Sequence, residues 1–177
     1  MTHGSDRTIN RVSVAASIGL VLMVVATFGY IGWPLVAGAI GVKSAPPAPA
    51  YAAGQAFDAP AEWYANAPKT LVIFARASCA ACDKAQPFLK TLIASVEGRA
   101  AAVMAHPPGT VEEDTAFAKR LGIAETDIRP VTAGLRVRAT PTIVLVDRQG
   151  MILAAFEGAG KPERQAEITK AIDAALR

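Results

Sequence analysis

The sequence contains very few side chains that could hold a metal ion. Among 177 residues there are only two cysteines and two histidines. A tetrahedral zinc site needs about four ligands. The histidines are His3 and His106, and a membrane span predicted between them, at residues 12–42, would keep them apart. We therefore expect no metal and no other cofactor.

The chain also lacks a concentrated charge of either sign. It carries 18 Lys and Arg against 15 Asp and Glu, a formal net charge of +3. From residue 58 onward there are 15 basic and 14 acidic residues, so this part is nearly neutral. The basic side chains are scattered singly, without a stripe or interleaved aromatic residues. This pattern excludes a nucleic-acid partner.

The two cysteines stand close together, as Cys79-Ala80-Ala81-Cys82. They follow an apolar, strand-like run at residues 70–75 and precede a helical pattern. The start of a helix offers unpaired N–H groups and a positive dipole end to the first sulfur, which lowers the pKa of its thiol. The spacing predicts a redox-active pair in which Cys79 attacks and Cys82 resolves the mixed disulfide.

A permanent structural disulfide is the alternative for this pair, since each cysteine is the other's only possible partner within the chain. Closing so short a ring removes little chain entropy, so a staple here would stabilise the fold little. The motif therefore favours redox chemistry.

The N-terminal part of the chain contains a long uncharged run at residues 12–33, and its apolar character continues to residue 42. This length is sufficient to cross a hydrocarbon layer of about 30 Å as a helix. Arg7 and Arg11 precede the run, whereas only Lys43 follows it closely. The positive-inside rule then predicts a single-pass protein of the cell inner membrane, with its N-terminus cytoplasmic and its C-terminal domain periplasmic.

A cleaved signal peptide is the alternative, although its apolar core would usually be only about 7–15 residues long. Either outcome exports the C-terminal domain to an oxidising compartment. The predicted organisation is a cytoplasmic tail at 1–11, a transmembrane helix or signal anchor at 12–42, a linker at 43–57 and a folded domain at 58–177. Proline and alanine dominate the linker, which predicts a semi-extended tether rather than a packed element.

The folded domain alternates between strand and helix patterns. We expect strands at residues 69–75, 100–105, 142–147 and 151–157, the last two forming a hairpin. We expect helices at residues 58–66, 79–96, 110–122 and 162–176. His106 is expected in a turn at 106–109, and residues 123–134 show no clear period. This order predicts an α/β domain with a mixed sheet and helices on both faces.

Several of these features together resemble the thioredoxin superfamily over residues 69–176. The strand at 71–74 leads into the cysteine pair, and Pro87 falls five residues after Cys82. Thr140-Pro141-Thr142 opens a later strand, and the hairpin and the terminal helix follow in the family order. The resemblance implies a thioredoxin-like fold with a cis peptide bond before Pro141. It also implies that Thr140 and Pro141 bind an extended substrate beside the sulfurs.

The sequence departs from that family at informative places. Ile73 stands where thioredoxin buries an aspartate that accepts a proton, and Ser78 replaces the tryptophan before the first cysteine. Ala85 stands where membrane-anchored, cytochrome-maturation relatives usually have a glutamate. The resemblance therefore implies the superfamily without fixing the subfamily.

We expect a membrane-tethered thiol–disulfide oxidoreductase that acts on exported proteins. Its partners would be protein thiols and disulfides of the cell envelope, a membrane or periplasmic redox protein that recharges it, and the lipid bilayer around its N-terminal helix. The competing hypothesis is a non-catalytic thioredoxin-fold binding module of the envelope with a structural disulfide.

Overall fold

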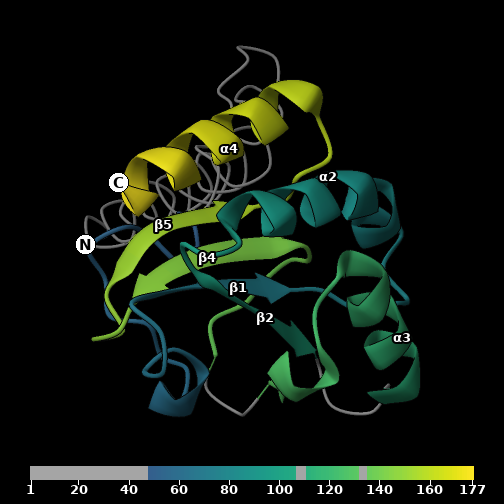
Figure 1. Ribbon diagram of the computed structural model, residues 1–177. Helices are drawn as coiled ribbons and strands as arrows, with labels where there is room; N and C mark the ends of the chain where they lie inside the picture. Colours follow the sequence, from purple (N-terminus) through teal and green to yellow (C-terminus); the bar gives the residue numbers. More distant parts are fainter. Residues whose placement is uncertain (1–47, 107–110, 132–134) are drawn as a thin grey trace, which may run out of the picture. The chain divides into compact units, whose positions relative to one another are not determined.

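The computed structural model of the protein describes residues 48–106, 111–131 and 135–177 (Figure 1). The predicted cytoplasmic tail and membrane segment, residues 1–42, lie outside the described residues, as do residues 107–109 of the predicted turn. Within the described ranges, no helix combines the length and the hydrophobicity needed to cross a bilayer.

The helices and strands follow the predicted order closely. In chain order they are η1 (Ala61–Trp63), β1 (Lys69–Phe74), α2 (Ala80–Val96), β2 (Ala101–His106), α3 (Val111–Leu121), η2 (Glu125–Asp127), β3 (Ile128–Pro130), β4 (Thr142–Asp147), β5 (Ile152–Glu157) and α4 (Pro162–Leu176). The four predicted strands and the three long helices are confirmed to within a residue at each end.

The predicted helix at 58–66 is wrong in length, because only η1, a single turn of 3-10 helix, forms there. Asp58, the first residue of that predicted helix, does not cap η1. Its carboxylate instead accepts hydrogen bonds from Tyr51 Oη at 2.8 Å and from Arg136 Nε at 2.9 Å. A side chain engaged in this way leaves the first backbone N–H groups without a cap.

The strands form one mixed sheet in the order β3-β2-β1-β4-β5. β2 lies parallel to both β1 and β3, whereas β4 lies antiparallel to both β1 and β5. The predicted mixed sheet is confirmed. The edge strand β3 is not predicted by the sequence pattern, because three residues ending in proline are too short to show alternation.

The prediction of helices on both faces of the sheet needs correction. Buried residues of α2, α3 and α4 all belong to one core, packed on Leu71, Ile73 and Leu145. The physical reason is the strand order. β1, β2 and β3 are parallel, and each lies further towards the same edge of the sheet than the one before it. The two right-handed crossovers between them therefore put α2 and α3 on the same face. Among the described residues, the opposite face is covered by the segment at 50–63, whose only helix is η1 (Figure 1).

This covering segment also corrects the predicted linker at 43–57. Tyr51 and Phe57 are buried rather than solvated, and the Tyr51 ring stacks on Phe74 of β1 with 6.0 Å between centroids. Ala50 N donates to Glu157 Oε1 at 2.8 Å. The linker prediction is therefore wrong for residues 50–57, because two aromatic side chains in a Pro/Ala-rich stretch suffice to dock it on an apolar sheet face.

Candidate active site

The cysteine pair lies where β1 delivers the chain to the start of α2. β1 is fully buried after its first residue, and a short loop of residues 75–78 then leads to Cys79, the N-cap of α2. Cys79 has extended backbone angles, φ −110° and ψ 105°, and its sulfur accepts a hydrogen bond from Cys82 N at 3.1 Å. The sulfur thus takes the place of the oxygen that usually satisfies a free N–H at a helix start.

The second half of the site comes from the segment that opens β4, about sixty residues further along the chain. Thr140 Oγ1 donates to Cys79 Sγ at 3.2 Å, and Cys79 Sγ lies 3.5 Å from the Thr140 carbonyl oxygen. The Thr140–Pro141 peptide bond is cis, as the resemblance implies. Gly158 N donates to the Pro141 carbonyl oxygen at 2.8 Å, which ties this segment to the end of β5. The structure therefore brings together all four predicted site residues, Cys79, Cys82, Thr140 and Pro141.

The two thiols have opposite environments. Cys79 keeps 9% of its surface exposed, whereas Cys82 is fully buried against the helix-side core. Both cysteines are free thiols in this structure. The thiol that the spacing predicts to attack is thus the less buried of the two.

These environments move the two pKa values apart. Burial by itself raises the pKa of Cys79, but hydrogen bonds from the Cys82 thiol, the Thr140 hydroxyl and backbone N–H groups at the helix start lower it below its usual value overall. Burial raises the pKa of Cys82 to about 11, and its hydrogen bond to Cys79 adds to the rise. Of the two thiols, Cys79 is therefore the one that ionises first as pH rises, as a nucleophilic thiol requires.

A buried carboxylate that the sequence reasoning missed supports the loop before Cys79. Asp114, in the first turns of α3, is fully buried, and its Oδ1 accepts a hydrogen bond from Ala77 N at 2.6 Å. Its other oxygen lies 3.6 Å from Nδ1 of His106. His106 is the buried last residue of β2, so its predicted place in a turn is wrong.

A periodic signal for Asp114 was present in the sequence. The buried face of α3 consists of Asp114, Phe117, Ala118 and Leu121, which recur at the spacing of an amphipathic helix. Because Asp114 follows Glu112 and Glu113, all three resemble solvated charges that favour a helix start. The position expected to hold a family carboxylate, Ile73, is instead part of the apolar core.

Two hollows of comparable volume lie among the described residues. The first, which we call the arginine groove, has a volume of about 330 Å³ and is lined by Phe74, Arg76, Ala105, Val131, Val137, Arg138, Ala139 and Thr140. It adjoins the site directly, since Thr140 hydrogen-bonds to the Cys79 sulfur.

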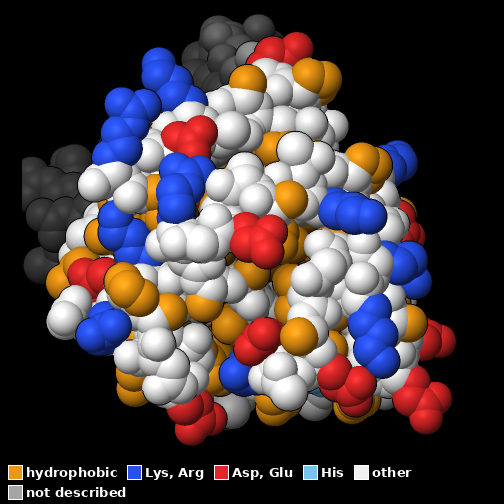
Figure 2. Space-filling model, in the orientation of Figure 1, with side chains coloured by type: hydrophobic (Ala, Val, Ile, Leu, Met, Phe, Trp, Pro, Cys, Tyr) orange, Lys and Arg blue, Asp and Glu red, His pale blue; other side chains and the backbone are white. Residues whose placement is uncertain are grey.

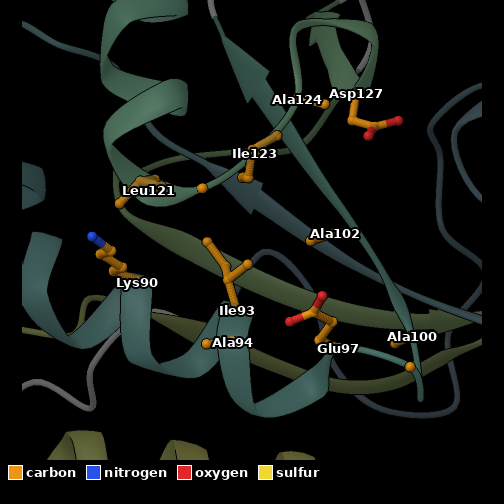
Figure 3. Close-up of a pocket in the computed structure, with 12 residues that line it drawn as sticks. Lys90, Ile93, Ala94, Glu97, Ala100, Ala102, Leu121, Ile123, Ala124 and Asp127 are labelled. Atoms are coloured by element: carbon orange, nitrogen blue, oxygen red, sulfur yellow. The ribbon is translucent and has the colours of Figure 1, made fainter.

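The second hollow, the α2–α3 pocket, has a volume of about 380 Å³ and lies between α2, the end of α3 and η2 (Figure 3). Ile93 points into it from α2, facing Leu121 and Ile123. None of the cysteines or Thr140 lines it. Among the described residues, no group of three or more His, Cys, Asp or Glu side chains is placed to hold a metal ion.

The mixed sheet, the dithiol at a helix N-terminus and the cis-proline segment beside it define a thioredoxin-like oxidoreductase fold. A family model described as a thioredoxin-like domain matches residues 57–173, more than half of the chain. The chain therefore belongs to the thioredoxin-like domain family, and the superfamily assignment made from the sequence is confirmed. No curated protein matches the chain.

Solved structures with this fold are thiol–disulfide proteins at low sequence identity. The thioredoxin domain of a thiol–disulfide oxidoreductase from Bacteroides vulgatus has a TM-score of 0.53 and 14% identity, over 72% of this chain and 99% of that one. A thiol:disulfide interchange protein of the thioredoxin family from Chlorobium tepidum has a TM-score of 0.50 and 18% identity, over 76% and 100%. A secreted disulfide oxidoreductase from Mycobacterium tuberculosis has a TM-score of 0.50 and 15% identity, over 64% and 85%.

Proposed function

We propose that this protein exchanges thiols for disulfides with client proteins, with Cys79 as the nucleophile and Cys82 as the resolving thiol. The observation that carries the proposal is the set of donors on one sulfur. Cys82 N at 3.1 Å and Thr140 Oγ1 at 3.2 Å both point at Cys79 Sγ. Donors that are already in place stabilise the thiolate without reorganisation during the reaction.

In the reducing direction, the Cys79 thiolate attacks one sulfur of a client disulfide. A Cys79–client disulfide forms, and the client's second sulfur leaves as a thiolate that takes up a proton. Cys82 then loses its proton to solvent and attacks Cys79 Sγ, which releases the first client sulfur. The client gains two electrons and two protons, and Cys79 and Cys82 are left as a disulfide. The oxidising direction uses the same atoms in reverse.

The raised pKa of Cys82 determines which of the two thiols reacts first with the client. A resolving thiol with a pKa of about 11 is almost entirely protonated at neutral pH, so it does not compete with Cys79 for the client. Once Cys79 is in a mixed disulfide, its negative charge no longer opposes ionisation of Cys82. Burial still raises its pKa at that stage, so the second step depends on loss of the Cys82 proton to solvent.

The test is to trap the intermediate. In a Cys82→Ala variant of the full chain, Cys79 should remain in covalent complexes with client proteins, which reducing agent dissolves. The matched control is the Cys79→Ala, Cys82→Ala double variant, which should trap nothing. Absence of trapped clients together with absence of insulin-disulfide reduction by the unmodified protein would contradict the proposal. It would favour the alternative of a binding module with a structural disulfide.

We further propose that residues 12–42 tether this domain to the cell inner membrane and that its clients are exported proteins. The uncharged run and the preceding arginines support this, and the related fold from Mycobacterium tuberculosis is described as secreted. A membrane or periplasmic redox protein would then recharge the pair. In spheroplasts, an external protease should digest the domain, and the mass of the intact protein should include residues 1–42. A shorter mature mass would identify a cleaved signal peptide instead.

A further inference from the structure

The arginine groove carries information about which clients the site accepts. Its inner wall is apolar, with Phe74, Ala105 and Val137 among the lining residues. Its charged lining residues are Arg76 and Arg138, and no carboxylate lines it. On the face shown in Figure 2, by contrast, basic and acidic side chains are interspersed. A hollow with an apolar wall and only positive charge favours an occupant that is both apolar and negatively charged.

Both arginines belong to the two segments that hold the reacting sulfur. Arg76 lies three residues before Cys79 in the loop that follows β1, and Arg138 lies two residues before Thr140. A client segment that extends beside Thr140 and presents a disulfide to Cys79 must therefore pass close to both of them. The groove's volume of about 330 Å³ is sufficient for one or two side chains of such a segment.

Neither arginine has its charge neutralised by a described residue. Arg76 is exposed and forms no ion pair or side-chain hydrogen bond with the described residues. Arg138 Nη1 donates to the carbonyl oxygen of Ala48 at 2.9 Å, a neutral partner that leaves the guanidinium charge available. The neighbouring Arg136 differs, since it pairs with Asp58 at 2.9 Å. Guanidinium groups bind carboxylates through two parallel hydrogen bonds.

We propose that this groove selects client segments in which an apolar side chain and an acidic side chain lie next to the reacting cysteine. The apolar side chain packs on the wall at Phe74, and the carboxylate pairs with Arg76 and Arg138. This inference rests on the proposed function, because it names the substrate class of the same site. The inference predicts differences between clients in their rate of reaction with Cys79, and it does not alter the steps of the exchange reaction.

The experiment uses three peptides that are identical except at one position. Each has a single cysteine, activated as a mixed disulfide with 2-thiopyridine, a neighbouring leucine, and Glu, Gln or Lys beside that leucine. The second-order rate of thiopyridone release by the reduced full chain is measured at low and at high salt. We expect the rate of release to fall from the Glu peptide to the Gln peptide to the Lys peptide. At low salt the Glu peptide should react about tenfold faster than the Lys peptide, and this difference should become smaller at high salt.

The variant Arg76→Gln, Arg138→Gln should remove this order, with the largest loss of rate for the Glu peptide. Arg148→Gln, in the exposed turn between β4 and β5, is the matched control and should keep the order. Equal rates for the three peptides in the unmodified protein would overturn the inference while Cys79-dependent release still supported the proposed function. An unchanged order in the double variant would also overturn it. No Cys79-dependent release from any peptide would overturn both proposals.

Discussion

The two hollows of this domain are similar in size and different in chemistry. The α2–α3 pocket is the larger, about 380 Å³ against about 330 Å³ for the arginine groove. Its rim carries Lys90, Glu97 and Asp127, which are charges of both signs (Figure 3). The arginine groove has cations alone and adjoins the Cys79 sulfur through Thr140. Size therefore does not distinguish the two hollows; the proposal for the arginine groove rests on its uncompensated charge beside Cys79.

The largest expected effect is a loss of activity from a substitution beside the arginine groove, compared with a substitution at the α2–α3 pocket. Cys79→Ala removes the sulfur that we propose as the nucleophile, so we expect insulin-disulfide reduction to fall by about 1000-fold or more. Glu97→Gln, at the rim of the α2–α3 pocket, is the matched variant and should change the rate by less than about twofold. Substantial residual activity in Cys79→Ala would show that the reaction does not use this sulfur, and a large loss in Glu97→Gln would erase the contrast between the hollows.

The second prediction concerns the two thiols at the groove. Below about pH 8, iodoacetamide should modify Cys79 about 100-fold or more faster than Cys82, because the pKa of Cys79 is lowered and that of Cys82 is raised to about 11. The rate at Cys79 should reach half its maximum below the usual thiol pKa. Mass spectrometry of the reduced protein, sampled over time, assigns the modified residue. Comparable rates at both thiols would contradict the structure.

The same shifts give the sign of a stability change with pH. Cys82 is held as the neutral thiol, so its contribution to folding is complete below the usual thiol pKa and is lost as pH rises towards about 11. Cys79 acts oppositely, because its lowered pKa favours the folded state above the usual thiol pKa. Urea unfolding of Cys82→Ala should therefore lose less stability between pH 9 and about 11 than the unmodified protein does.

The next prediction concerns Asp114, the buried carboxylate that supports the loop before Cys79. Asp114→Ala leaves Ala77 N without its partner and His106 without a nearby carboxylate in the interior, so the free energy of unfolding should fall by about 3 kcal/mol. Asp127→Ala, at the rim of the α2–α3 pocket, pairs only loosely with Arg129 at 3.9 Å and should cost about 0.5 kcal/mol or less. Urea denaturation at neutral pH measures both. Equal losses would mean that Asp114 carries no special structural role.

Asp114 also shows where sequence reasoning stops. The cysteine pair, Thr140 and Pro141 could be predicted because each lies in a local pattern: an apolar strand followed by a helix start, and a Thr-Pro-Thr triplet before a strand. Asp114 acts through Ala77, 37 residues away in sequence, and no local pattern reports that contact. The burial of His106 was also not predicted. The Pro-Pro-Gly that follows it indicates a turn, and this local signal carries no information on whether the residue before it is buried.

In the fold, too, features with a local sequence pattern could be predicted, and features that depend on distant contacts could not. The long strands and helices could be predicted because their hydrophobic periods are strong. β3 could not, because its three residues are held by pairing with β2, and neither could the docking of Tyr51, which depends on Phe74 and Arg136. The placement of α3 on the same face as α2 depends on β3 as well, because the parallel pairing of β3 with β2 makes α3 part of a second right-handed crossover.

The smallest expected effect concerns one hydroxyl between the groove and the nucleophile. Thr140→Val keeps the shape of the side chain but removes the donor that lies 3.2 Å from Cys79 Sγ. A hydrogen bond to a charged group contributes about 1.5 kcal/mol, so the pKa of Cys79 should rise by about one unit and exchange at neutral pH should slow by up to about tenfold. Thiolate absorbance at 240 nm against pH, with Cys82→Ala as the background, measures the pKa.

Thr91→Val is the matched control for that change. Its hydroxyl donates only to the Pro87 carbonyl oxygen within α2, at 3.0 Å, so neither the pKa of Cys79 nor the exchange rate should move. If Thr140→Val left the pKa of Cys79 unchanged, the helix start alone would set the thiolate's stability. The groove would then contribute only to client binding, and the contrast with the α2–α3 pocket would rest on the arginines and not on the chemistry at the sulfur.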